Sequence, residues 1–186
     1  MPVVRGKEIE VFYSASTIAR RNLELAKQVA ERDYEDLLVI SILKGSFIFA
    51  ADLIRAMYDV GISPEVEFMM ISSYGAGTTS GEIKVQRDID NDVAGRDILL
   101  IDDILESGKT LKFTRDLMLS RGAKSVSIAV LLDKRSRRQA DLEADFVGFE
   151  CPDYFVVGYG MDVAHAFREL PFVGVVRGDA EADTTG

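Results

Sequence analysis

Two short runs of apolar residues constrain the fold of this chain more than any other feature of its sequence. Residues 37–43 read LLVISIL and residues 97–101 read DILLI, with no alternation of apolar and polar positions. Such runs are typical of strands that are covered on both faces, as in a parallel sheet. Comparable strands are predicted over 65–71 and 126–132. Other elements must therefore cover both faces of a central sheet.

Amphipathic helices are predicted between these strands. Two of them span 47–58 and 109–120, and a third has Ser14 or Ser16 as its N-cap and ends near Asp33. Shorter β-prone runs follow at 146–149, 154–157 and 172–176. The alternation of strands and helices predicts an α/β fold, with a mainly parallel central sheet flanked by helices.

The remaining segments set the domain boundaries. Residues 1–176 are predicted to form a single domain, and the acidic, small-residue segment 177–186 is expected to be a disordered tail. Residues 72–81 read SSYGAGTTSG, which is polar, rich in glycine and without periodicity. They predict a flexible loop, and a loop of this length in a compact domain is often a functional lid.

Composition excludes several classes of function. The 186 residues carry 22 basic and 31 acidic side chains, a formal charge of −9, whereas general nucleic-acid binding requires a basic surface. The single Cys151 can form no internal disulfide and no metal cluster. No signal peptide or membrane-spanning run is evident. We therefore expect a small-molecule partner, neither nucleic acid nor membrane, and a cytoplasmic location.

The segment 98–110, ILLIDDILESGKT, joins a buried strand to the start of a helix. Ligands of open α/β sheets bind at this end of the strands. The backbone amides and hydroxyls of residues 107–110 suit a phosphate monoester at a helix N-terminus. A Walker A motif would need glycine at position 103, which holds aspartate. Asp102 and Asp103 can instead accept hydrogen bonds from a ribose diol, so the segment predicts a sugar-phosphate site.

This segment resembles the phosphoribosyl-pyrophosphate motif of type I phosphoribosyltransferases. Further blocks resemble the hypoxanthine-guanine phosphoribosyltransferases in content and order. They are LKGS at 43–46, SSY at 72–74, SGEIK at 80–84, LLDKR at 131–135, DFVGF at 145–149, and DYFVVGYGMD at 153–162 with FREL at 167–170. The resemblance covers residues 37–176.

The resemblance implies an enzyme of purine salvage. Such an enzyme transfers phosphoribose from phosphoribosyl pyrophosphate to N9 of a 6-oxopurine, hypoxanthine and to some degree guanine, and releases pyrophosphate with Mg²⁺ bound. It also implies a small hood formed by the terminal segments, and an assembly of two or four copies of the chain.

The resemblance assigns a role to each matching residue. The implied substrate contacts are Asp102 and Asp103 with the ribose hydroxyls; Glu106, Ser107, Gly108, Lys109 and Thr110 around the 5′-phosphate; Lys44, Gly45 and Arg168 with pyrophosphate; Lys134, Phe155 and Val156 with the purine; and Ser73 and Tyr74 with bound substrate. Asp162, with Asp102 and Asp103, is the implied ligand set for Mg²⁺. The Leu43–Lys44 peptide is implied to be cis.

Two positions depart from the family pattern. Glu106 stands where the family usually has aspartate, a residue assigned to proton handling at purine N7. Asp102 stands where relatives more often have glutamate. Both changes keep the charge, so they alter the reach of a carboxylate and leave the reaction class unchanged.

Other readings of these residues remain open. Asp102 and Asp103 could be a solvated strand end, and residues 107–110 a simple helix cap. Only Lys134 matches the motif in its basic run; Arg135, Arg137 and Arg138 are expected to lie on the surface. His165 has no serine or cysteine partner at a recognisable spacing and is expected on the surface. The alternative functions are a transferase for another base, such as xanthine, and an RNA-binding regulator with the same fold, which the negative charge disfavours.

Overall fold

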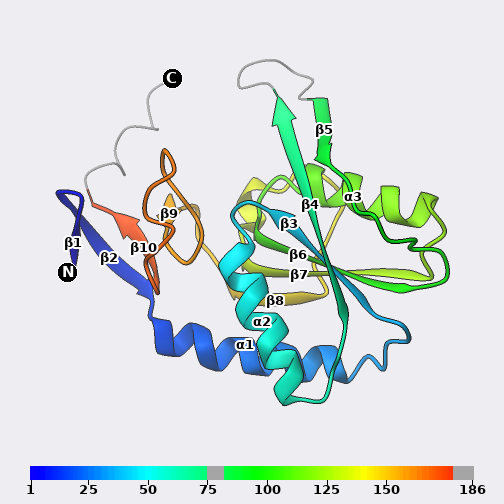
Figure 1. Ribbon diagram of the computed structural model, residues 1–186. Helices are drawn as coiled ribbons and strands as arrows, with labels where there is room; N and C mark the ends of the chain where they lie inside the picture. The colour runs from blue at the N-terminus through cyan, green and yellow to red at the C-terminus, as the bar shows by residue number, and fades with distance from the viewer. Residues whose placement is uncertain (75–81, 178–186) are drawn as a thin grey trace.

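A computed structural model describes residues 1–74 and 82–177, and a six-stranded sheet forms its centre (Figure 1). The order of the strands is β5-β4-β3-β6-β7-β8. Their bounds are β3 Leu38–Leu43, β4 Glu65–Tyr74, β5 Glu82–Arg87, β6 Asp97–Leu105, β7 Ser125–Asp133 and β8 Phe146–Glu150. All neighbours pair in parallel except β5, which runs antiparallel to β4 at one edge. The expected α/β fold with a mainly parallel sheet is confirmed.

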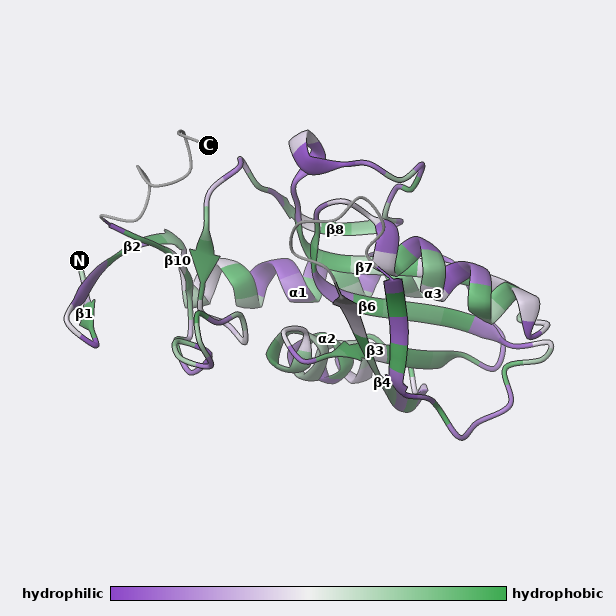
Figure 2. Cartoon of the chain, turned by 90° about the horizontal axis from the view of Figure 1, so that it is seen from above, coloured by the Kyte–Doolittle hydropathy of each residue, from purple (hydrophilic) through white to green (hydrophobic). Residues whose placement is uncertain are grey.

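Helices cover both faces of this sheet. Helices α1 (Ala15–Ala30) and α2 (Phe47–Asp59) pack against each other and over one face, and α3 (Lys109–Ser120) covers the other. Successive strand residues therefore enter different cores: Leu99 and Ile101 lie with α1 and α2, whereas Leu100 lies with α3. Burial on both faces explains the unbroken apolar runs. Figure 2 shows strands β6 and β7 largely in green, the colour of hydrophobic residues.

The expected ends of the helices are mostly confirmed. Ser14 is the N-cap of α1, and its hydroxyl accepts a hydrogen bond from the Thr17 amide at 3.2 Å. The helix stops at Ala30, before the expected Asp33, which adopts a positive φ of 51° that helical residues do not have.

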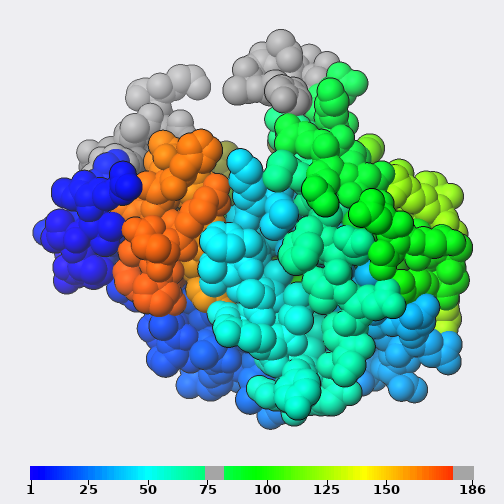
Figure 3. Space-filling model, viewed as in Figure 1, coloured from blue at the N-terminus to red at the C-terminus, as the bar shows by residue number. Residues whose placement is uncertain are grey.

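The two ends of the chain form a second sheet, the hood. It has the order β1-β2-β10-β9, with β1 Val3–Val4, β2 Lys7–Tyr13, β9 Val156–Val157 and β10 Val173–Val176. Its buried residues include Ile9, Val157 and Phe167. Figure 3 shows these segments, in blue and orange, gathered beside the main body of the molecule. The expected hood from the terminal segments is confirmed.

Two strands run further than the sequence indicates. Strand β4 continues through Ser72 and Ser73 to Tyr74, so the start of the expected loop is wrong, and residues 75–81 lie outside the described part. Strand β6 continues to Leu105 because Ile104 and Leu105 pair with Leu132 and Asp133 of β7. The expected tail lies outside the described part beyond position 177. No helix among the described residues is long and apolar enough to cross a membrane.

Candidate active site

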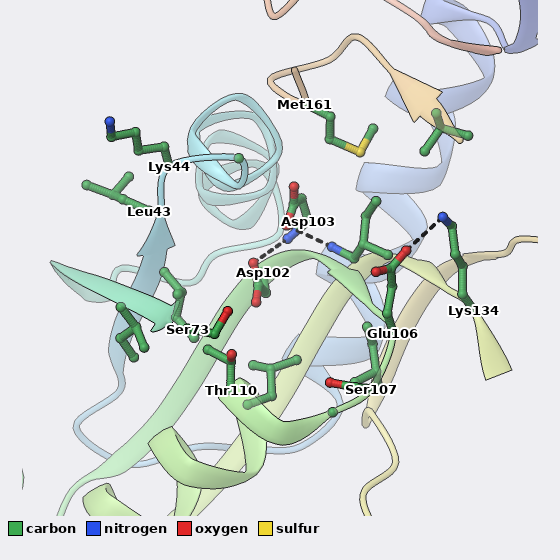
Figure 4. Close-up of a pocket in the computed structure, with 18 of the residues that line it drawn as sticks. Leu43, Lys44, Ser73, Asp102, Asp103, Glu106, Ser107, Thr110, Lys134 and Met161 are labelled. Carbon is green, nitrogen blue, oxygen red and sulfur yellow. Dashed lines mark hydrogen bonds and ion pairs between the residues drawn. The ribbon is translucent and has the colours of Figure 1, made fainter. Parts of the chain in front are cut away.

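A pocket of about 460 Å³ lies at the carboxyl ends of β3, β6 and β7, between the central sheet and the hood (Figure 4). Its lining includes most of the residues singled out in the sequence: Lys44, Gly45, Ser73, Asp102, Asp103, Glu106, Ser107, Gly108, Thr110, Lys134, Phe155, Val156 and Asp162. Met161 also lines it, although no sequence pattern gave this residue a role. The position agrees with the rule that ligands of α/β sheets bind where the parallel strands end.

Asp102 and Asp103 lie near the carboxyl end of strand β6, which continues for two more residues to Leu105. The Asp103 amide donates to the Asp102 carboxylate and the Ile104 amide to the Asp103 carboxylate, each at 2.9 Å (Figure 4). Burial, and next the Asp103 carboxylate, raise the pKa of Asp102 well above its usual range. Two carboxylates held this close favour ligands that donate hydrogen bonds or carry positive charge.

The turn after β3 faces this acidic pair. The Leu43–Lys44 peptide is cis, which confirms the expectation. A Cβ atom on Gly45 would lie 2.1 Å from the Asp103 Oδ2, so only glycine leaves room for that carboxylate. The buried Ser46 hydroxyl donates to the Ile42 carbonyl and shares a hydrogen bond with Ser41 at 2.8 Å. These bonds fix the turn against the acidic pair.

The loop between β6 and α3, residues 106–108, has the shape of a phosphate site, and we call it the phosphate loop. Gly108 is the N-cap of α3 with a φ of +78°, a left-handed conformation that glycine adopts without strain. Ser107, Gly108 and Thr110 line the pocket. Lys109 is exposed and does not line it, although its amide donates to the Ser107 hydroxyl at 3.3 Å. The start of α3 thus forms one side of the pocket.

Glu106 and Lys134 form an ion pair in the pocket. The Lys134 Nζ lies 2.8 Å from the Glu106 Oε1, and Lys134 is only 4% exposed (Figure 4). The Lys134 amide donates to the Leu105 carbonyl at 2.9 Å, which continues the register of β6 and β7 and sets the two side chains side by side. A buried ammonium requires such a partner. The sequence indicated both residues separately but did not predict their contact.

The hood supplies the opposite wall. Phe155 is 60% exposed and lines the pocket, so it has the accessibility that a stacking surface needs. Asp162 lines it too; its carboxylate pairs with Arg168 at 3.0 Å and accepts from the His165 amide at 2.7 Å. Arg168 does not line the pocket and donates to the Gly160 carbonyl at 2.7 Å. Arg168 therefore lies behind Asp162. The His165 side chain is 84% exposed, as expected.

The residues of the pocket fit a magnesium ion. Among residues 1–74 and 82–177, no group of three or more acidic, histidine or cysteine side chains could hold a metal by itself. Magnesium at phosphate sites, however, uses only one or two protein carboxylates and takes its other oxygens from phosphates and water. The acidic pair on β6 and Asp162 on the hood present such carboxylates to the pocket.

One sequence expectation about the basic run is wrong. The side chains of Arg135 and Arg137 are exposed, 62% and 56%, as expected, but that of Arg138 is only 12% exposed. The Arg138 guanidinium turns inward because it donates to the Asp133 carboxylate and to the carbonyls of Glu106 and Leu142.

As for the 72–74 block, Ser73 lines the pocket, and Tyr74 ends β4 and pairs with Glu82 of β5.

Comparison with known proteins agrees with this geometry. Residues 10–164 match the model of the phosphoribosyl transferase domain. The hypoxanthine phosphoribosyltransferase of Escherichia coli strain K12 is 43% identical over 172 residues, which cover 90% of this chain and 95% of that protein. The hypoxanthine-guanine phosphoribosyltransferase of Aquifex aeolicus is 46% identical over 180 residues, covering 95% and 99%. A crystal structure of a hypoxanthine phosphoribosyltransferase from Staphylococcus aureus superimposes with a TM-score of 0.86 at 37% identity, covering 94% of each chain.

Proposed function

Since the chain belongs to the phosphoribosyl transferase family, we propose that it acts as a hypoxanthine phosphoribosyltransferase of purine salvage. In this reaction the purine N9 forms a bond to C1 of the ribose 5-phosphate unit, and the bond from C1 to pyrophosphate breaks. The products are inosine monophosphate and pyrophosphate. The observation that carries the proposal is a single pocket that joins an acidic pair, a phosphate loop and a Lys–Glu pair.

The two halves of phosphoribosyl pyrophosphate match two parts of the pocket. Asp102 and Asp103 accept hydrogen bonds from the ribose hydroxyls, and the segment 107–110 at the start of α3 binds the 5′-phosphate. Lys44 and Gly45, on the facing turn, bind the pyrophosphate, whose charge increases as the bond breaks. Arg168 contributes to pyrophosphate binding indirectly, because its ion pair holds the Asp162 carboxylate at the pocket. Magnesium, when bound to Asp102, Asp103 or Asp162, neutralises the charge of the leaving group.

The Glu106–Lys134 pair explains selection of a 6-oxopurine. Its ammonium and carboxylate lie 2.8 Å apart and present a donor beside an acceptor. The edge of hypoxanthine offers the complement, because O6 accepts a hydrogen bond and a protonated N7 donates one. Adenine has an amino group at position 6, so a donor would face the Lys134 donor and remain unpaired. Phe155 stacks on the ring, and the Val156 backbone contacts its other edge.

The test is direct. Purified protein is incubated with phosphoribosyl pyrophosphate, Mg²⁺ and each of hypoxanthine, guanine, xanthine and adenine, and nucleotide formation is followed by chromatography. We expect inosine monophosphate from hypoxanthine and a guanine product at some rate, because guanine has the same O6 and N7 edge. Adenine as the best substrate would overturn the role of Lys134, and no nucleotide from any base would overturn the proposal.

Two further expectations accompany this function. Assembly into two or four copies stays a prediction, which light scattering coupled to size-exclusion chromatography would test. The cytoplasmic location also stays a prediction. The alternative of an RNA-binding regulator finds no support, since the similar proteins are named as phosphoribosyltransferases.

A further inference from the structure

The phosphate loop is held from behind by the segment that follows β7. Three consecutive carbonyls, that of Leu105 at the end of β6 and those of Glu106 and Ser107 in the loop, accept hydrogen bonds from this segment. The donors are the Lys134 amide to Leu105 at 2.9 Å, the Arg138 Nε to Glu106 at 3.0 Å, and the Gln139 and Ala140 amides to Ser107 at 3.0 and 2.8 Å. All three carbonyls are therefore turned toward residues 134–140.

This arrangement determines where the loop amides point. In a trans peptide the carbonyl and the following amide point in opposite directions. The amides of Glu106, Ser107 and Gly108 consequently point away from the supporting segment, and these same residues line the pocket on the other side. A loop whose amides converge on one side is the usual binding site of an anion.

Arg138 is the one side chain among these donors in the described part of the chain. Its guanidinium also donates to the Leu142 carbonyl and to the carboxylate of Asp133, whose side chain is fully buried. Its stem passes directly beneath Gly108, where a Cβ atom would lie 3.1 Å from the Arg138 Cδ. Substitution of this side chain therefore removes one loop contact and leaves the backbone donors in place.

We propose that Arg138, anchored by Asp133, is a positioning residue for the phosphate loop. It orients the peptide between Glu106 and Ser107, so that the Ser107 amide faces the 5′-phosphate and the Glu106 side chain faces the purine. The inference rests on the proposed function, because it assumes that the loop binds the phosphate of a nucleotide.

The test compares a ligand that carries the 5′-phosphate with one that lacks it. Dissociation constants of inosine monophosphate and inosine are measured for the native protein and for Arg138→Met, which keeps the length of the stem but removes the donors. We expect inosine monophosphate to bind at least about tenfold more weakly to the variant, the scale of one lost hydrogen bond to a charged group, and inosine to bind almost unchanged. Arg138→Lys should lie between the two proteins.

Two further variants make the result decisive. Arg135→Met is the matched control, since Arg135 contacts the same Asp133 carboxylate at 3.2 Å from the exposed side but has no contact with Glu106 among the described residues; it should keep native affinity for both ligands. If Arg138→Met fails to fold because the buried Asp133 carboxylate keeps only Arg135 as its partner, the double variant Asp133→Asn, Arg138→Met removes both charges and should show the same selective loss.

The outcomes separate the two proposals. Equal weakening of both ligands, or unchanged binding of inosine monophosphate in a folded variant, would overturn the role of Arg138 and leave the proposed function intact. A native protein that binds no inosine monophosphate would instead contradict the proposed function.

Discussion

The carboxylate at position 106 reaches one methylene further than the aspartate of the family pattern, and in the structure it uses that reach to contact the Lys134 ammonium at 2.8 Å. If Glu106 handles the proton at N7, Glu106→Gln should lower kcat by about 100-fold or more, the usual scale of general acid–base catalysis. Binding of phosphoribosyl pyrophosphate should persist. Rapid-quench kinetics together with a substrate-binding titration would separate the two effects.

Glu106→Asp serves as the comparison for that change. It keeps the charge and restores the residue common in the family, so we expect substantial activity. Equal and small effects of both substitutions would show that Glu106 only stabilises the start of α3, where an acidic side chain contributes about 0.3–1 kcal/mol.

Asp103 lies against Gly45 and accepts the Ile104 amide, so its carboxylate is held in one place. Asp103→Asn should weaken binding of phosphoribosyl pyrophosphate by about 10- to 100-fold, because an amide accepts less strongly from the ribose hydroxyls than a carboxylate does. The KM for hypoxanthine should change much less. Asp102→Asn should behave similarly, and Asp116→Asn on the exposed side of α3 is the control. Native kinetics of both pocket variants would reduce the acidic pair to a strand end.

At the scale of elements, the turn between β6 and α3 depends on a left-handed residue. Gly108→Ala adds both the strain of a φ of +78° and a Cβ atom 3.1 Å from the Arg138 Cδ. We expect a loss of about 1–3 kcal/mol in the free energy of unfolding, measured by denaturant titration, and weaker binding of phosphoribosyl pyrophosphate. Gly122→Ala is the matched control, since Gly122 has a φ of +90° at the other end of α3 but lies outside the pocket lining. Native substrate affinity of Gly108→Ala would contradict a role of this turn in phosphate binding.

Some elements of the fold were predictable from the sequence and others were not. Strands β3, β6 and β7 are buried on both faces, and their apolar runs report this directly. Strands β2 and β5 were not predicted, because most of their residues are exposed and neither forms an apolar run. The edge strand β5 pairs only with β4, and β2 lies between β1 and the distant β10, with Ile9 opposite Val176.

The candidate active site also has features that the sequence predicted and features that it did not. The acidic pair and the phosphate loop are contiguous in sequence, so local pattern and family resemblance identified them together. The Glu106–Lys134 pair and the inward turn of Arg138 depend on how β6 and β7 align, with Leu105 opposite Asp133. No local pattern encodes that register, and a run of basic residues by itself indicates an exposed surface.

In the whole molecule, the hood and the central sheet meet at one pocket. We therefore predict that binding of the purine and binding of phosphoribosyl pyrophosphate can be weakened separately. Phe155 and Val156 belong to the hood, where β9 pairs with β10 and β10 with β2, and the fully buried Ile9 of β2 packs under that sheet. Ile9→Ala should lower the free energy of unfolding by about 2–5 kcal/mol.

That loss is expected to act selectively, because a loosened hood displaces Phe155 and Val156 from the purine and leaves the acidic pair and the phosphate loop in place. Of the groups assigned to phosphoribosyl pyrophosphate, only Asp162 and its partner Arg168 belong to the hood. The KM for hypoxanthine should rise several-fold more than the KM for phosphoribosyl pyrophosphate. Ile128→Ala, in the core between the central sheet and α3, is the control for destabilisation alone and should leave the ratio of the two KM values unchanged. An equal change of that ratio in both variants, in steady-state kinetics well below their unfolding midpoints, would show that the hood does not hold the purine independently of the central sheet.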